Sequence, residues 1–221
     1  MKRPAASWAG LAVLAGALSP PVEAAVGRSL AAHMLQHLAL LLVGPGLLAL
    51  DRPWARVASL LPRARGMLDS ASDALRRPGM SGAVILVAAG FHAVVVSAWH
   101  APAAYDAAVA SAPLHIVEHA TFIAAGWATW VAARAAATME PAAAIAGLFL
   151  VAAQGAALGA ILTFAGTPLY ESTAADALAD QQLAGLIMWV PGGAPYAAAA
   201  AWVVARAVGH GRSAELAVVR R

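Results

Sequence analysis

The 221-residue chain contains no cysteine, a single lysine and few charged residues of any kind. Without cysteine it forms no disulfide, thiolate metal site or CxxC redox centre, so a bound metal must be held by histidine, methionine, carboxylate or carbonyl groups. Charged residues make up 11% of the chain and hydrophobic residues 62%, whereas soluble domains carry about a quarter charged residues. This composition indicates an all-α, polytopic bundle of membrane-spanning helices.

Six apolar segments are long enough to cross a bilayer, which takes about 20 helical residues. They lie at roughly 7–25, 30–50, 80–99, 114–133, 142–165 and 182–207. The first has a basic start, a short apolar core and a small-residue end, which also fits a secretory signal peptide. We therefore expect five or six spans: residues 1–29 form an N-terminal span or signal peptide, 30–207 the bundle and 208–221 a cytoplasmic tail.

Arginine is concentrated in alternate connecting segments. The loop 51–79 carries six arginines and the stretch 206–221 carries four, whereas 100–113 and 166–181 contain neither lysine nor arginine. By the positive-inside rule we expect the C-terminus, and an uncleaved N-terminus, in the cytoplasm. Because the basic residues follow this topology, the isoelectric point near 10 does not indicate a nucleic-acid partner.

Two further sequence patterns predict a surface helix and two interruptions of the membrane helices. The segment "RARGMLDSASDALRR" at 63–77 places apolar residues on one helical stripe, which suits a helix lying on the membrane surface, although an ordinary polar loop is the alternative. Gly44-Pro45-Gly46 and Pro191-Gly192-Gly193 interrupt the second and sixth segments. We expect both to bend their helices and to leave carbonyls that need partners.

Six of the seven histidines lie in three consecutive segments, and five of them cluster toward the outer face. The second and fourth segments each open with a pair of pattern H-x-x-[Q/E]-H, and residues four apart share one helical face. His92 lies about 12 Å deeper than the histidine that ends its segment, and His210 falls in the tail. The five outer histidines are His33, His37, His100, His115 and His119.

These five histidines predict a metal or haem site. A histidine inside a span is costly unless it is paired or functional, and imidazole suits copper, zinc, iron and nickel. Polar groups and a thioether collect near the same level, and the expected auxiliary residues are Met34, Glu118, Asp106, Asp180 and the deeper His92. Glu118 would fix an imidazole tautomer, and Met34 or Met188 would favour Cu(I). Packing is the alternative for both methionines.

Three other functions stay open on the residues alone. Histidine pairs on two helices also suit axial ligation of haem, in an electron carrier or a haem-delivery protein. "HIVEH" at 115–119 formally matches the H-x-x-E-H motif of inverted zinc peptidases, which makes an intramembrane metalloprotease a weaker alternative, because no companion motif supplies a third ligand. The third alternative is a scaffold protein whose histidines serve only the packing of the helices.

Four blocks resemble the CtaG-type (caa-type) cytochrome c oxidase assembly factor family. They are "HMLQHLALLLVGPGLLAL", "WHAPAAYDAAVASAPLHIVEH", "LGAILTFAGTPLYES" and "DQQLAGLIMWVPGG", in the order in which the family carries them and spanning about 30–207. The five outer histidines and Asp180 fall within these blocks.

The resemblance implies a non-enzymatic role in maturing the haem–copper oxidase. The expected cargo is copper, which would be captured outside and passed on by ligand exchange, with haem as the alternative cofactor. The expected partners are cytochrome c oxidase subunits within the lipid bilayer, and the expected location is the inner (plasma) membrane of a bacterial cell.

Overall fold

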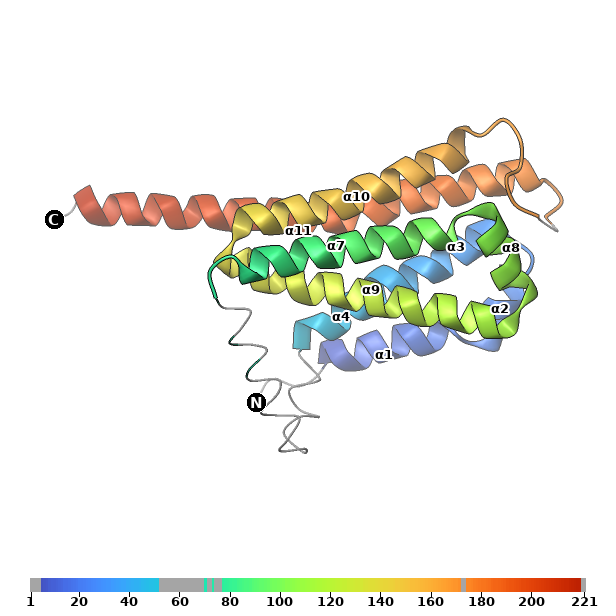
Figure 1. The fold of residues 1–221 in the computed structure, drawn as a ribbon, viewed down its shortest axis with the longest axis horizontal. Helices are drawn as coiled ribbons and strands as arrows, with labels where there is room; N and C mark the ends of the chain where they lie inside the picture. Colours follow the sequence, from blue (N-terminus) through green and yellow to red (C-terminus); the bar gives the residue numbers. More distant parts are fainter. Residues whose placement is uncertain (1–4, 52–69, 71–72, 74–76, 172–173, 220–221) are drawn as a thin grey trace.

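The computed structural model describes residues 5–51, 70, 73, 77–171 and 174–219. Within these residues the chain forms helices and no strand, which confirms the all-α prediction (Figure 1). The amphipathic helix predicted at 63–77 lies almost entirely outside them. In chain order the elements are α1 Ala5–Ala17, α2 Pro20–Val26, α3 Leu30–Leu38, the π-helix η1 Ala39–Val43, α4 Gly44–Asp51, α7 Met80–Trp99, α8 Pro102–Ala110, α9 Ala112–Met139, α10 Pro141–Phe164 and α11 Ala177–Val219.

Four stretches are long and apolar enough to cross a membrane by themselves: Leu30–Asp51, Met80–Trp99, Pro141–Phe164 and Ala177–Gly209. Two bent pairs raise the number of candidate spans to six. The axes of α1 and α2 differ by 53°, and those of α8 and α9 by 119°. The prediction of five or six spans agrees with this range, and the fourth predicted segment forms the longer helix α9.

Successive long helices run in opposite directions (Figure 1). The start of α1, the start of α7, the end of α9 and the outgoing end of α11 therefore share one end of the bundle. Arg77 and Arg134 belong to this end, because they lie just before α7 and in the second half of α9. The starts of α3 and α9 and the end of α7 share the opposite end, which is where the histidine pairs meet.

Small residues let the helices approach closely. Gly159 on α10 and Gly185 on α11 face each other so tightly that a Cβ on either would collide with the carbonyl oxygen of the other. The largest buried cluster joins α7, α9 and α10 through side chains such as Ile85, Ala133 and Leu148. Such contacts are typical of membrane bundles, where van der Waals packing between small residues replaces the hydrophobic effect.

The Gly44-Pro45-Gly46 interruption takes the form of a π-helical turn. The Gly44 N–H bonds to the Ala39 carbonyl, five residues back, and Pro45 has no N–H to offer to the Leu41 carbonyl. The Leu42 carbonyl instead accepts a bond from the Trp130 indole at 3.2 Å. One carbonyl of this irregular turn is thus bonded by a side chain of α9. Around the second interruption, by contrast, α11 continues as one helix through its two internal prolines.

Gly126 lets α9 pack directly against this irregular turn. A Cβ at Gly126 would overlap the Leu41 carbonyl oxygen, so only glycine permits the two backbones to lie so close. About two turns earlier, α9 carries Glu118 and His119. The contact therefore sets the distance between the histidines of α3 and those of α9.

A carboxylate joins α9, α10 and α7 at the other end of the bundle. Glu140 lies between α9 and α10, and its carboxylate accepts a 2.7 Å hydrogen bond from the Ser81 hydroxyl in the first turn of α7. This bond lowers the pKa of the Glu140 carboxyl below its ordinary value, and backbone N–H groups at the start of α7 act in the same direction. The ionised carboxylate thus caps α7, where a negative charge is favourable.

Candidate metal centre

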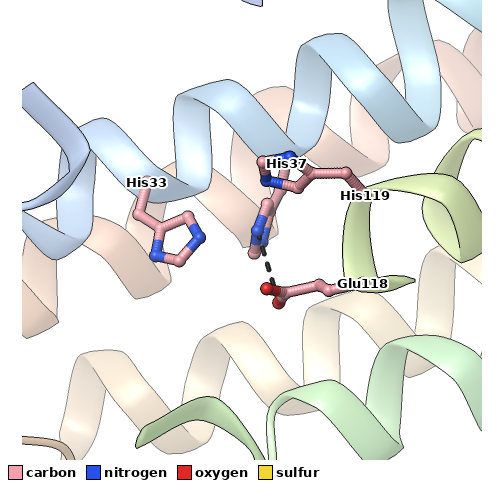
Figure 2. A group of neighbouring side chains, drawn as sticks. All are labelled: His33, His37, Glu118 and His119. Carbon is pink, nitrogen blue, oxygen red and sulfur yellow. Dashed lines mark ion pairs between the residues drawn. The ribbon is translucent and has the colours of Figure 1, made fainter. Parts of the chain in front are cut away.

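Four side chains from α3 and α9 point into one space inside the bundle (Figure 2). His33 and His37 lie one turn apart on the same face of α3, and Glu118 and His119 are neighbours on α9. Each of the four offers one ligand atom, and these atoms all lie within 4.8 Å of one another. We call this group the inner cluster. The two helices thereby bring one histidine pair and half of the other within reach of a single ion.

The inner cluster is buried and its hydrogen bonding is incomplete. Glu118 and His33 have no exposed surface, and His37 and His119 are also buried. His37 Nε2 lies 3.5 Å from Glu118 Oε1, yet neither ring nitrogen of His37, neither carboxylate oxygen of Glu118 and not His119 Nε2 has a hydrogen-bond partner. Buried polar groups are rarely left so, because each costs about 1–3 kcal/mol. A cation bound by one ligand atom from each of these three side chains would satisfy part of this set.

His115 lies at the outer edge of the inner cluster. Its Nε2 is 3.4 Å from His33 Nε2 and 3.9 Å from Glu118 Oε2. Its Nδ1 is 3.8 Å from Glu23 Oε2, and 19% of its side chain is exposed. His115 therefore joins the buried donors to the more exposed end of α2.

His100 and Met34 lie on another side of the inner cluster. His100 Nδ1–H donates to the Val96 carbonyl at 2.7 Å, which leaves the Nε2 lone pair facing Met34 Sδ at 3.4 Å. A metal-binding histidine commonly donates its other ring N–H in this way. The His100 and His37 rings are 6.0 Å apart, and Phe122 packs on the His37 ring at 4.6 Å as an apolar floor.

One family profile, described as the cytochrome c oxidase caa3 assembly factor (Caa3_CtaG), matches residues 1–209. The chain belongs to this family. No curated protein and no solved structure matches it. The match confirms the resemblance predicted for 30–207 and also takes in α1 and α2. The protein is therefore an oxidase assembly factor built from membrane helices, and its family implies an interaction with cytochrome c oxidase.

Two tyrosines of the assembly factor contact the histidines, one from α8 and one from the segment between α10 and α11. The Tyr105 hydroxyl on α8 lies 3.2 Å from His33 Nδ1. The Tyr170 hydroxyl donates to the His100 carbonyl at 2.8 Å. Burial, together with the nearby Asp106 carboxylate, raises the pKa of the Tyr170 phenol to about 12, so this donor keeps its proton at neutral pH. Both contacts tie the connecting segments at this end to the site.

Three of the predicted auxiliary residues lie apart from the inner cluster. Asp180 accepts hydrogen bonds from the Ser29 hydroxyl and the Leu30 N–H, each at 2.6 Å, and so caps the start of α3. Asp106 accepts a 3.4 Å bond from the backbone N–H of the Tyr170–Glu171 loop. His92 is buried deeper, with Nδ1 3.4 Å from the Thr129 hydroxyl. Asp180 therefore affects the site through the position of α3.

Two contributors were not predicted as site residues, Glu23 and Gln36. Gln36 Nε2 donates to Glu23 Oε1 at 2.6 Å and to the Ala17 carbonyl at 2.9 Å, which ties α2 and the end of α1 to α3. The signal in the sequence was a lone carboxylate within an apolar segment, which is unusual unless it has a partner. Its partner, His115, lies 92 positions further along the chain, so spacing alone did not connect them.

Proposed function

We propose that this assembly factor binds copper at the inner cluster and passes it to cytochrome c oxidase. The observation that supports this most strongly is a set of four buried side chains from two helices, with ligand atoms within 4.8 Å of one another. Three of the four, His37, Glu118 and His119, have polar atoms without a hydrogen-bond partner. Imidazole and carboxylate groups without cysteine form a donor set suited to a first-row transition ion. The family's place in oxidase assembly then selects copper, a metal of the haem–copper oxidase, as the cargo.

The spacing of the donors supports an ion in preference to haem. Ligands held tetrahedrally at 2.0–2.1 Å from a metal are about 3.3 Å apart. The ligand atoms of the four inner-cluster side chains lie within 4.8 Å of one another, so small side-chain movements would bring them to that separation. A haem would have to place its porphyrin ring between axial histidines. Here the His33 and His37 rings are already in contact, with centroids 4.2 Å apart.

The neighbouring thioether supports copper in preference to zinc. Met34 is buried and its sulfur faces the lone pair of His100 Nε2. Thioether sulfur is a soft ligand that favours Cu(I). Histidine and methionine ligands also release an ion without reprotonation of a thiolate, which suits a protein that must hand its cargo on.

The same geometry supports a role without turnover chemistry. If the protein were a metalloprotease of the H-x-x-E-H type, Glu118 would activate a water molecule next to an open metal position. Glu118 is instead fully buried, with His37 and His115 on two sides of its carboxylate. A peptide would have to reach this carboxylate through the packed ends of α3 and α9.

Copper binding by the full-length protein tests the proposal. We expect about one tightly held copper ion per chain in purified wild type, no haem Soret band, and loss of most copper when His33, His37 and His119 are changed to alanine. His92→Asn removes a buried histidine outside the inner cluster and should keep its copper. Equal copper content in the wild type and the triple variant, with both correctly folded by circular dichroism, would reject the site.

A further inference from the structure

The donors at this end of the bundle differ sharply in their access to water. The Glu23 side chain is 36% exposed and that of His115 is 19% exposed, whereas Glu118 and the α3 histidines are buried. Together with Met34 and His100, these groups exceed the three or four protein ligands that a copper or zinc ion usually takes. One ion bound in the inner cluster therefore does not need Glu23 or His115 as ligands.

We propose that Glu23 and His115 form an outer capture position, where a copper ion binds before it moves to the inner cluster. The proposal rests on the copper-binding function proposed above. The two ligand atoms, Glu23 Oε2 and His115 Nδ1, are 3.8 Å apart, a separation that one ion can bridge. They belong to α2 and α9, the elements that meet at the outer rim of the site.

Gln36 positions the carboxylate for this task. Its amide donates to Glu23 Oε1 at 2.6 Å, which turns the second oxygen, Oε2, toward His115. The same amide donates to Ala17, the last residue of α1, so one side chain of α3 holds both α1 and α2. This explains why the first histidine pair encloses glutamine: the residue orients an outer ligand.

His115 faces both positions. Its Nδ1 is directed toward Glu23, while its Nε2 lies 3.4 Å from His33 Nε2 and 3.9 Å from Glu118 Oε2. An ion held at Nδ1 must leave this nitrogen before it can bind the groups that face Nε2. Transfer therefore breaks the bonds to Glu23 and to Nδ1, with a half-turn of the His115 ring or passage of the ion along it, as bonds to His33 or Glu118 form; the oxidation state of copper does not change. The partly exposed carboxylate also raises the local concentration of cations at the rim.

The kinetics of copper uptake distinguish a capture position from a final ligand. A group that binds the ion only on its way in changes association and dissociation by the same factor, because the end states are unchanged. We expect Glu23→Gln and His115→Phe each to slow transfer of Cu(I) from its bicinchoninate complex by about tenfold or more. The final copper-to-protein ratio and the dissociation constant should match those of the wild type.

Glu171→Gln is the matched control, because it removes an exposed carboxylate from the same end of the bundle. It should take up copper at the wild-type rate. Unchanged rates in both variants would overturn the proposal, and so would a weaker dissociation constant caused by faster release alone, since that would make the pair final ligands. If Glu23→Gln fails to fold, His115→Phe carries the test. Wild type that binds no copper would instead reject the proposed function.

Discussion

Glu118 is the residue on which the chemistry of the inner cluster depends most. Its carboxylate is fully buried, has no hydrogen-bond partner and lies 3.5 Å from His37 Nε2. Burying such a group without compensation is costly. A carboxylate kept there despite this cost is best explained by a cation that it helps to bind.

The first prediction follows from this cost. Glu118→Gln keeps the size of the side chain but removes its charge, so we expect copper affinity to fall by about tenfold or more. The metal-free variant should melt no lower than metal-free wild type, because a neutral amide is easier to bury. A ligand stabilises the folded protein more the more tightly it binds, so the rise in Tm on adding copper should be smaller in this variant. Thermal melts with and without copper measure both effects.

Two results would contradict this reading of Glu118. One is an undiminished rise in Tm on adding copper. The other is a large loss of stability in the metal-free variant, which would show that the carboxylate serves packing rather than metal binding.

Residue spacing predicted part of the site. The two H-x-x-x-H pairs each place their rings on one helical face, so the convergence of His33, His37 and His119 followed from periodicity and topology. The function of Asp180 did not, because helix capping depends on a contact across 150 residues. The position of Glu23 beside His115 was likewise hidden, since α2 and α9 are far apart in the sequence.

At the scale of elements, the π-turn η1 and its contact with α9 hold the two halves of the inner cluster at their observed distance. We predict that Gly126→Ala lowers stability by about 1–3 kcal/mol, the usual cost of overpacking. The added methyl would overlap the Leu41 carbonyl oxygen and push α9 away from η1. Copper affinity should fall as well, because Glu118 and His119 move with α9. Thermal melts and copper titration check the two effects.

Gly90→Ala is the matched control for this prediction. Gly90 lies within α7, and a Cβ there meets no atom within 4 Å. Because alanine favours helix by up to about 1 kcal/mol over glycine, this variant should be as stable as the wild type or slightly more so. If both glycine variants behave alike, the close contact at Gly126 has no special role.

A pH-dependent prediction belongs to the junction of α7, α9 and α10. The pKa of Glu140 is lowered in the folded protein, chiefly by the Ser81 hydroxyl. Its stabilising contribution is therefore fully present above the unfolded-state pKa and is lost as pH falls through the lower folded-state pKa. The Tm difference between wild type and Glu140→Gln should be largest near about pH 7 and shrink below about pH 4.5.

The Ser81→Ala background provides the check on its cause. Without the hydroxyl, the folded and unfolded pKa values of Glu140 move closer together, so Glu140→Gln should change Tm less than it does in wild type. A Tm difference that stays constant from neutral to acidic pH would show that the charge of Glu140 does not matter to stability.

The helices themselves were largely predictable, and their irregularities were not. Runs of apolar residues located four of the six segments to within two residues of the observed helices, whereas α9 and α11 are longer than predicted. The form of the second segment depends on Pro45 and on Trp130, which is distant in the sequence and donates its indole N–H to the Leu42 carbonyl. The sharp bend between α8 and α9 arises at Ser111, where the backbone is extended, and no periodicity marks such a position in advance.

At the scale of the whole molecule, capture of copper from outside requires the histidine end of the bundle to face away from the cytoplasm. The structure groups the starts of α3 and α9 at one end and Arg77 and Arg134 at the other (Figure 1). By the positive-inside rule we expect the histidine end to lie outside the cytoplasm. Copper captured there would not have to cross the bilayer before reaching the inner cluster.

Single cysteines test this orientation directly, because the natural chain has none. We predict that Glu171→Cys reacts with a membrane-impermeant maleimide in intact spheroplasts, whereas Arg77→Cys reacts only after lysis. Both positions are exposed and lie at opposite ends of the bundle. The reverse labelling pattern would place the histidine end in the cytoplasm and reject capture from outside.

The central claim is that the histidines of α3 and α9 hold copper, and X-ray absorption at the copper edge of the loaded full-length protein tests it most directly. We expect outer-shell scattering from at least two imidazole rings, with copper–nitrogen distances of about 2 Å. We also expect this signal to be lost when His33, His37 and His119 are replaced by alanine. A copper environment without imidazole scattering, or one that is unchanged in the triple variant, would contradict it.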